Sequence, residues 1–150
     1  MAKDFSSIKL TELNKFYILE KFNLYMQVKD LVRNVYTIDE DFPLSKIAQI
    51  MCTKKVGEVL FMDEDVIKGI ITEDDLVRNF DKGKKVTDVM TTRVITIDEN
   101  RSIDDALELM NARSIKRLPV VDKKGKMIGV IKLVDIARHS KELEEDFFFE

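Results

Sequence analysis

An internal repeat is the feature of this sequence that most limits its possible folds. The hexapeptide VYTIDE, which begins at Val35, returns as VITIDE beginning at Val94, with five of six positions identical. This repeat register then shifts by one inserted residue for the later pairs, which are Gly69 and Gly129, Ile71 and Ile131, and Asp75 and Asp135. Two copies of roughly 60 residues each favour a duplicated unit packed as a pseudo-symmetric pair over a solenoid. Clefts between two related halves are natural ligand sites.

Composition excludes several classes of function. The chain has 150 residues and a formal net charge of −3, so we expect no general attraction to nucleic acid. A single Cys52 and a single His139 provide neither an intrachain disulfide nor a zinc ligand set, and we expect no metal. No apolar run approaches the ~20 residues of a membrane span, and the first residues lack a signal-peptide pattern. We therefore expect a cytoplasmic protein without membrane contact.

Hydrophobic periodicity predicts the same order of elements in both copies. Each copy begins with a strand, continues with a helix, forms two strands around a polar turn and ends with a second helix, which gives β-α-β-β-α twice. The expected strands are residues 35–38, 59–62, 66–71, 94–97, 118–121 and 127–131, and the first helices are residues 44–51 and 103–112. An amphipathic helix over residues 11–28 precedes the repeats, and a last helix runs to Leu143. The expected divisions are an N-terminal helical segment (1–27), repeat 1 (28–80), repeat 2 (86–138) and a helix end with a tail (139–150).

Each copy ends its last strand with a glycine, two β-branched residues and a turn into a helix. The two segments read GIITEDD from Gly69 and GVIKLVD from Gly129. They resemble the corresponding motif of the CBS domain family, whose members pair into Bateman modules. The resemblance spans residues 28–137 and includes the openings VKDL (28–31) and VTDVM (86–90), and RLPVVD (117–122). It implies an α/β fold in which two tandem CBS repeats pack through their sheets about a pseudo-twofold axis.

The resemblance also implies binding of adenine nucleotides. In the family, the Asp of this motif binds ribose and the Thr or Ser three positions earlier binds phosphate, and Asp75 and Thr72 match these two positions. A carboxylate can accept hydrogen bonds from two ribose hydroxyls, and a Thr hydroxyl beside free helix amides suits a phosphate. The full set of candidate nucleotide-binding residues is Thr37, Ile38, Gly69, Thr72, Asp75, Thr96, Ile97, Arg117, Pro119, Lys132 and Asp135.

Two parts of this set have a structural alternative. Thr37 with Ile38, and Thr96 with Ile97, resemble the strand segments that flank adenine in the family, and ordinary strand packing is the alternative. Arg117 resembles a basic position that reaches phosphate in some members, because a guanidinium presents a planar fork of donors. A surface ion pair is the alternative for Arg117.

Helix capping is the alternative explanation for Thr72 and Asp75. Thr at the N-cap and Asp three residues later can form a capping box, which stabilises a helix by about 0.5–2 kcal/mol without any ligand. In the second copy Lys132 replaces the Thr and has no acceptor for a helix amide, yet Asp135 remains. Capping therefore explains Asp75 better than Asp135. We expect two unequal sites. The first has the residues better suited to bind ribose, and the second has Arg117 as the better cation for a phosphate.

These features favour a regulatory sensor over an enzyme. The expected ligand is AMP, ADP, ATP or S-adenosylmethionine, bound as a regulatory ligand and not as a cofactor, and the expected partners are a second copy in a homodimer and a separate, unidentified protein. Acids at Glu73, Asp74 and Asp75 are typical of a helix's first turn, and His139 has no nucleophile assigned to it, so we expect no catalytic residue. The alternative is a ligand-free assembly module with vestigial clefts.

Overall fold

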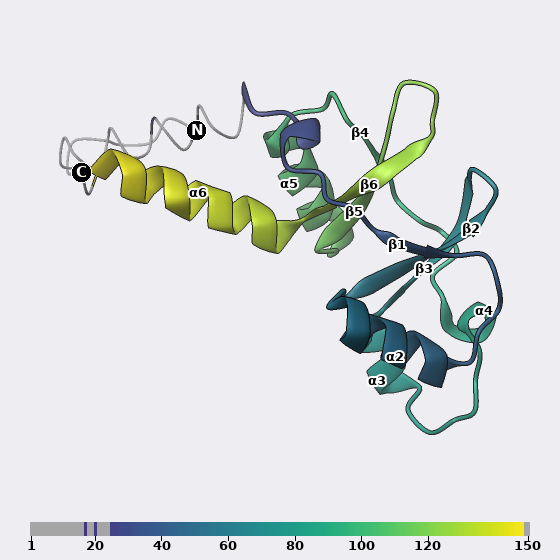
Figure 1. Cartoon of the computed structure of the whole chain (residues 1–150). Coiled ribbons are helices and arrows are strands. Elements are labelled where there is room, and N and C mark those ends of the chain that lie inside the picture. Colours follow the sequence, from purple (N-terminus) through teal and green to yellow (C-terminus); the bar gives the residue numbers. More distant parts are fainter. Residues whose placement is uncertain (1–16, 18–19, 21–24, 149–150) are drawn as a thin grey trace.

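The computed structural model describes Tyr17, Glu20 and residues 25–148, and it contains two three-stranded sheets, one in each repeat (Figure 1). The first repeat consists of β1 (Tyr36–Ile38), α2 (Leu44–Lys54), β2 (Glu58–Asp63), β3 (Val66–Thr72) and α3 (Glu73–Arg78). The second consists of β4 (Ile97–Asp98), α5 (Ile103–Arg113), β5 (Arg117–Val121), β6 (Met127–Lys132) and α6 (Leu133–Phe148). A short helical turn opens each repeat, η1 (Val28–Asp30) and α4 (Val86–Val89). The predicted β-α-β-β-α order is confirmed in both copies.

The two sheets have the same topology. In each, the first strand runs parallel to the second, and the second pairs antiparallel with the third. Each hairpin also has one register shift, between Phe61 and Met62 in the first sheet and between Val120 and Val121 in the second. Phe61 and Val120 are equivalent positions in the repeat register, so the duplication extends to the irregularity within the strand pair.

The opening segments are exchanged between the repeats. Val28 and Leu31, which open the first repeat, are buried in the hydrophobic core of the second repeat with residues such as Ile103. Val86, which opens the second repeat, is buried in the core of the first. In Figure 1 the segment at η1 accordingly lies beside α5, and the chain then crosses to β1 in the other half. Each core is therefore completed by residues that belong, in sequence, to the other copy.

Backbone hydrogen bonds fix this exchange. Arg33 and Val130 donate to each other's carbonyls, both at 2.9 Å, and Ile70 and Thr91 form the same reciprocal pair at 3.0 and 2.9 Å. Arg33 and Thr91 therefore hold equivalent places, each at the edge of the opposite repeat's last strand. The two repeats are joined by matching pairs of bonds.

The motif glycines make room for these crossings. A Cβ added at Gly129 would overlap the backbone carbonyl oxygen of Arg33, and one added at Gly69 would overlap the side chain of Met90. Gly69 does not line the cleft described below. Its neighbours give it a packing role, and its expected contact with a nucleotide stays a prediction.

Three predicted boundaries differ from the structure. The strand expected at residues 94–97 is β4 (Ile97–Asp98), which pairs with β5 at Ile97 with Val120 and at Asp98 with Val121. The last helix, α6, continues past Leu143 to Phe148, with Lys141 and Glu145 paired one turn apart on it. The helix expected over residues 11–28 lies mostly outside the described residues, and Gln27 forms an extended bridge with Ser102. No helix within the described ranges has the length and apolar character required to cross a membrane.

Candidate functional site

A cleft of about 300 Å³ lies between the repeats. Three segments form it: the junction of β3 with α3 in the first repeat, the extended chain before β4, and the chain that leads from α5 into β5. It is lined by Ile70, Thr72, Asp74, Asp75, Arg78, Thr91, Arg93, Val94, Ile95, Ser114, Ile115, Lys116, Arg117 and Pro119. A ligand in this cleft would contact both copies at once.

Thr72 and Asp75 lie together at one end of the cleft, at the start of α3. Oδ2 of Asp75 accepts hydrogen bonds from the Thr72 backbone amide at 2.9 Å and from Thr72 Oγ1 at 3.2 Å. The capping interaction is thus present, and Asp105 accepts in the same way from the Ser102 amide at α5, away from the cleft. Oδ1 of Asp75 receives no hydrogen bond from the described residues. Asp75 can therefore cap its helix and still offer one carboxylate oxygen to a ligand.

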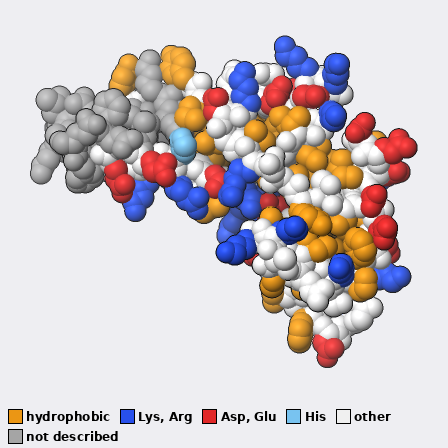
Figure 2. Space-filling model, viewed as in Figure 1, with side chains coloured by type: hydrophobic (Ala, Val, Ile, Leu, Met, Phe, Trp, Pro, Cys, Tyr) orange, Lys and Arg blue, Asp and Glu red, His pale blue; other side chains and the backbone are white. Residues whose placement is uncertain are grey.

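Basic side chains outnumber acidic ones around the cleft. Arg78, Arg93, Lys116 and Arg117 contribute four positive charges, whereas Asp74 and Asp75 contribute two negative ones. Figure 2 shows Lys and Arg side chains gathered where the two halves of the molecule meet. An anionic group such as a phosphate would be attracted to this surface.

Arg117 is already engaged. Its Nη1 donates to the carbonyl oxygen of Gly57 and to Oε2 of Glu58, both at 2.8 Å. The surface ion pair that we considered as the alternative for Arg117 is therefore present, but its partner Glu58 is buried and belongs to the other repeat. Arg117 still lines the cleft, and no described residue accepts from its Nη2 or Nε.

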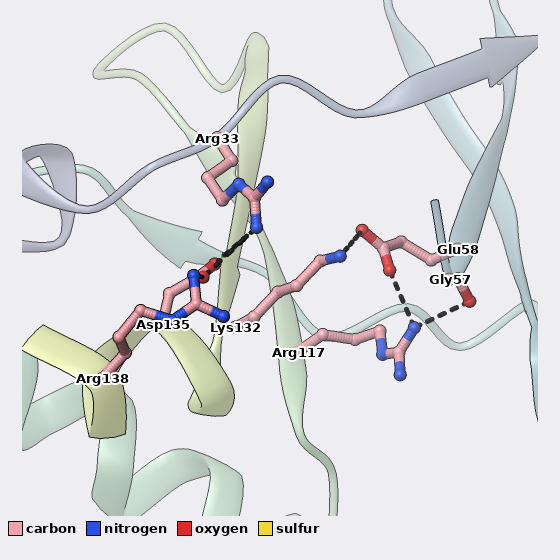
Figure 3. Close-up of polar contacts among 7 residues, drawn as sticks. All are labelled: Arg33, Gly57, Glu58, Arg117, Lys132, Asp135 and Arg138. Atoms are coloured by element: carbon pink, nitrogen blue, oxygen red, sulfur yellow. Dashed lines mark hydrogen bonds and ion pairs between the residues drawn. The ribbon is translucent and has the colours of Figure 1, made fainter. Parts of the chain in front are cut away.

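The repeat register assigns the cleft a counterpart in the molecule, and an ion-pair cluster occupies that counterpart (Figure 3). We define it as Arg33, Glu58, Arg117, Lys132, Asp135 and Arg138. Glu58 is only 2% exposed and pairs with Lys132 through Oε1 at 2.9 Å as well as with Arg117. Asp135 is buried and pairs with Arg33 at 3.2 Å and with Arg138 at 3.7 Å. Among the described residues, no buried side-chain nitrogen or oxygen lacks a hydrogen-bond partner.

The repeat register shows how the two regions differ. Glu58 and Arg117 are the same position in the two copies, and they pair with each other. Lys132 stands where the cleft has Thr72, and Asp135 stands where it has Asp75. In the cluster, both oxygens of Asp135 accept from Arg33, at 3.2 and 3.3 Å. The second candidate site is thus filled by the protein's own charges.

The candidate residues predicted from the sequence are divided among five places. Thr72, Asp75, Arg117 and Pro119 line the cleft. Lys132 and Asp135 belong to the ion-pair cluster, and Gly69 packs beneath Met90.

The four strand residues lie elsewhere. Thr37 and Ile38 border a separate hollow beside the hairpin turns, and Thr96 and Ile97 border another beside α5. Both isoleucines are buried in the cores, so strand packing, the alternative, accounts for their positions. These four residues do not line the cleft at Asp75, and their expected place beside adenine stays a prediction.

The sequence prediction missed part of the cleft. The lining residues Ile70, Val94 and Ile95 belong to the repeated motifs but were not assigned to a ligand. The other lining residues missed, Ile115, Arg78, Arg93 and Lys116, carry no motif. One signal was available for Glu58, because the repeat register aligns it with Arg117. The opposite charges of these two positions indicate a pair across the pseudo-twofold axis.

No metal site is evident in the part of the chain that the structure describes, where no three His, Cys, Asp or Glu side chains are grouped to hold an ion. One carboxyl outside the cleft has a shifted pKa. The Thr87 backbone amide and hydroxyl donate to Asp41, at 2.9 and 2.7 Å, and hold the pKa of that carboxyl below its usual value of 3.8. This bond fastens the start of α4 to the loop before α2.

Comparison with known sequences identifies the repeats. The model of the CBS domain matches residues 28–82 and again residues 86–142. The CBS domain-containing protein YhcV of Bacillus subtilis is 31% identical over 116 residues, which cover 73% of this chain and 82% of YhcV. Inosine-5′-monophosphate dehydrogenase of Thermoplasma acidophilum is 36% identical over 111 residues, covering 74% of this chain. The chain spans only 23% of the length of that dehydrogenase.

Solved structures give the same result. The CBS domain pair of protein MJ0100, in complex with 5′-methylthioadenosine and S-adenosyl-L-methionine, has a TM-score of 0.72 and 26% identity, over 78% of this chain and 97% of that one. The CBS-domain containing protein ATU1752 from Agrobacterium tumefaciens has a TM-score of 0.69 and 29% identity, over 76% of this chain and 98% of that one. The two sheets, the duplicated motif and these matches lead to one conclusion: the chain belongs to the CBS domain family and carries two CBS domains in tandem.

Proposed function

We propose that this chain is a regulatory module that binds an adenosine-containing ligand in the cleft and transmits its presence to a separate protein. The candidate ligands are AMP, ADP, ATP and S-adenosylmethionine. The observation that carries the proposal is the cleft itself, which both repeats line and which has a carboxylate at one end and a surplus of cations. The complex of the related MJ0100 pair with two adenosine derivatives supports this class of ligand.

The lining residues suit the three parts of such a ligand. Oδ1 of Asp75 would accept from the ribose hydroxyls, and its Oδ2 would continue to cap α3. The apolar side chains Ile70, Ile95 and Ile115 would pack against the adenine ring. Arg93 and Lys116 would attract the phosphates. Because the cleft is net positive, we expect ATP and ADP to bind more tightly than S-adenosylmethionine, whose sulfonium is a cation.

Binding alone does not regulate a partner. A ligand shifts an equilibrium only when it binds two arrangements of the protein with different affinities. Here the ligand would contact α3 and β3 of one repeat and the segments before β4 and β5 of the other, so it would favour the arrangement in which these segments are close. We propose that a partner protein recognises this arrangement and that the chain itself catalyses no reaction.

Isothermal titration with AMP, ADP, ATP and S-adenosylmethionine tests the proposal. We expect saturable binding of at least one of the four, and Asp75→Ala should weaken it roughly 10- to 100-fold, as for loss of a charge-assisted hydrogen bond. Asp105→Ala is the matched control, because it removes a capping carboxylate at α5 outside the cleft. If both variants weaken binding equally, Asp75 does not act through the ligand. If none of the four ligands binds the unaltered chain, the sensor proposal fails.

One surface favours the second candidate function, an assembly module. Val77 and Phe80, on and just after α3, are 76% and 82% exposed. Exposed apolar side chains of this size are typical of contact surfaces. We propose that they contribute to a homodimer, with or without a ligand. Light scattering should then report a dimer for the unaltered chain and a lower mass for Phe80→Ser, and a monomeric unaltered chain would contradict this part of the proposal.

A further inference from the structure

The structure points to a limit of one ligand per chain, and we infer that Glu58 sets it. Building on the proposed function, the inference is that Glu58 closes the ion-pair cluster to a nucleotide, so that only the cleft at Asp75 is available. The family motif occurs twice, which would suggest two sites. The contacts made by the second copy of the motif argue against a second nucleotide site.

The first argument concerns the ribose end. Both carboxylate oxygens of Asp135 accept from Arg33 Nη1, at 3.2 and 3.3 Å, and the carboxylate is buried. Asp75 has one oxygen without a described donor, because its contacts use Oδ2 alone. Ribose hydroxyls at Asp135 would have to displace a charged donor, whereas at Asp75 they would displace none. The same residue type is therefore free to bind in one copy and already bound in the other.

The second argument concerns the phosphate end. The position that is Arg117 at the cleft is Glu58 in the cluster, and Glu58 is 2% exposed. Both of its oxygens are engaged, Oε2 with Arg117 and Oε1 with Lys132. A phosphate brought to this region would meet a buried negative charge, and it would compete with that charge for Lys132. The cluster has the same formal surplus of cations as the cleft, four against two, but Glu58 is already paired with both cations at this end, Arg117 and Lys132.

The third argument concerns space. At the cleft, the two hydroxyl residues Thr72 and Thr91 are short. Their counterparts are Lys132, by the repeat register, and Arg33, by the matching backbone bonds to the opposite last strand. Figure 3 shows these two long side chains extended across the cluster toward Glu58 and Asp135. They fill the region where a ligand would otherwise lie, and Glu58 holds Lys132 in place.

Titration calorimetry on the full chain, with AMP and ATP as the probes, tests the inference. We expect one equivalent of nucleotide per chain, lost or weakened at least tenfold by Asp75→Ala. The matched variant Asp135→Ala should bind with an affinity within about twofold of the unaltered chain. Two equivalents per chain would overturn the inference and leave the proposed function standing. A loss of binding with Asp135→Ala but not with Asp75→Ala would overturn the inference and also the placement of the ligand in the cleft. Absence of binding by the unaltered chain would overturn both.

A second variant tests the role of Glu58 itself. Glu58→Gln keeps the size and one acceptor of the side chain but removes the charge, so Lys132 becomes available to an anion. We expect this variant to gain a second, weaker binding event with ATP. If a folded Glu58→Gln chain still binds one equivalent, Glu58 is not the residue that closes the cluster. Circular dichroism and the melting temperature establish that the variant is folded.

Discussion

The cleft and the ion-pair cluster are the same part of a duplicated unit, but their charged side chains are paired differently. Each has a motif aspartate at the start of a helix and a crossing segment from the other repeat. In the cluster, Arg33, Lys132 and Arg117 satisfy the acids Asp135 and Glu58 within the protein. In the cleft, Asp75 keeps an oxygen without a described donor, and Arg93 and Lys116 are exposed.

This difference shows how one scaffold can separate stability from binding. Charges that are paired internally are costly to disturb, because removal of one partner leaves the other buried and unpaired. Charges left exposed at a cleft contribute little to folding and remain available to a ligand. The two regions differ at a few positions of the repeat register, where Lys132 corresponds to Thr72 and Glu58 to Arg117.

The largest contrast is expected from removal of an acid in each region. Glu58→Ala should lower the free energy of unfolding by about 3 kcal/mol, because it leaves two partly buried cations, Arg117 and Lys132, without their carboxylate partner. Asp75→Ala should lower it by only about 1 kcal/mol, the usual effect of losing a helix cap. Urea denaturation of the two variants beside the unaltered chain measures both values. Equal losses would mean that the cluster is no more structural than the cleft.

The two motif glycines offer the next comparison. Gly129→Ala places a methyl group against the backbone of Arg33, which cannot move without breaking its bonds to Val130. Gly69→Ala meets mainly the flexible side chain of Met90. We expect losses of about 2–3 kcal/mol for Gly129→Ala and about 1 kcal/mol for Gly69→Ala. Thermal unfolding gives the ranking, and the reverse order would show that the crossing at Arg33 is the looser one.

A pair of exposed arginines sharpens the comparison for ligands. Arg93→Ala removes a cation from the cleft, and we expect the dissociation constant of ATP to rise about fivefold, a loss of about 1 kcal/mol. Arg33→Ala removes a cation of the cluster and should leave the dissociation constant unchanged. Titration of both variants at two salt concentrations provides the measurement, and the Arg93 contribution should decrease at the higher one. An effect of Arg33→Ala as large as that of Arg93→Ala would contradict a ligand confined to the cleft.

The smallest effect is expected at the loops before the first helix of each repeat. Asp41 binds Thr87, whereas its counterpart in the repeat register, Asn100, accepts a hydrogen bond from Lys29 at 3.4 Å. Because the pKa of Asp41 is lowered on folding, its contribution to stability is complete above 3.8 and is lost as the pH falls through the lower, folded value.

The matched substitution is Asp41→Asn, which copies the second repeat into the first. The difference in urea midpoint between this variant and the unaltered chain should be small at pH 6 and should shrink as the pH falls below 3.8. For Asn100→Ala the difference should not follow this pH dependence. A gap for Asp41→Asn that persists at low pH would contradict the assigned bond to Thr87.

The sequence predicted the architecture well because the architecture depends on local patterns that occur twice. The repeated hexapeptide, the alternating apolar residues and the polar turns were sufficient for the β-α-β-β-α order, which is confirmed. Boundaries failed where pairing between distant segments defines a strand, as at β4, which pairs with β5 only at Ile97 and Asp98 among the described residues. Periodicity does not report the partner of an isolated extended residue.

The site was predicted only in part, for the same reason. Thr72, Asp75, Arg117 and Pro119, which the resemblance had singled out, line the cleft, and their contact with a nucleotide stays a prediction. Ile38 and Ile97 lie in the cores instead, because consecutive side chains of a strand point to opposite faces and these two face the helices. The network around Glu58 joins residues from both copies, and only the register that aligns Glu58 with Arg117 gave any sign of it.

The exchange of the opening segments makes the two copies an obligate pair. A half-molecule that stopped after the first repeat would carry Val28 and Leu31 with no core to receive them, and it would lack Val86, which completes its own. Neither copy has a complete core of its own, so the two repeats are expected to fold and unfold in a single cooperative transition. During synthesis, the core of the first repeat could be completed only after the residues that open the second repeat, including Val86, have left the ribosome.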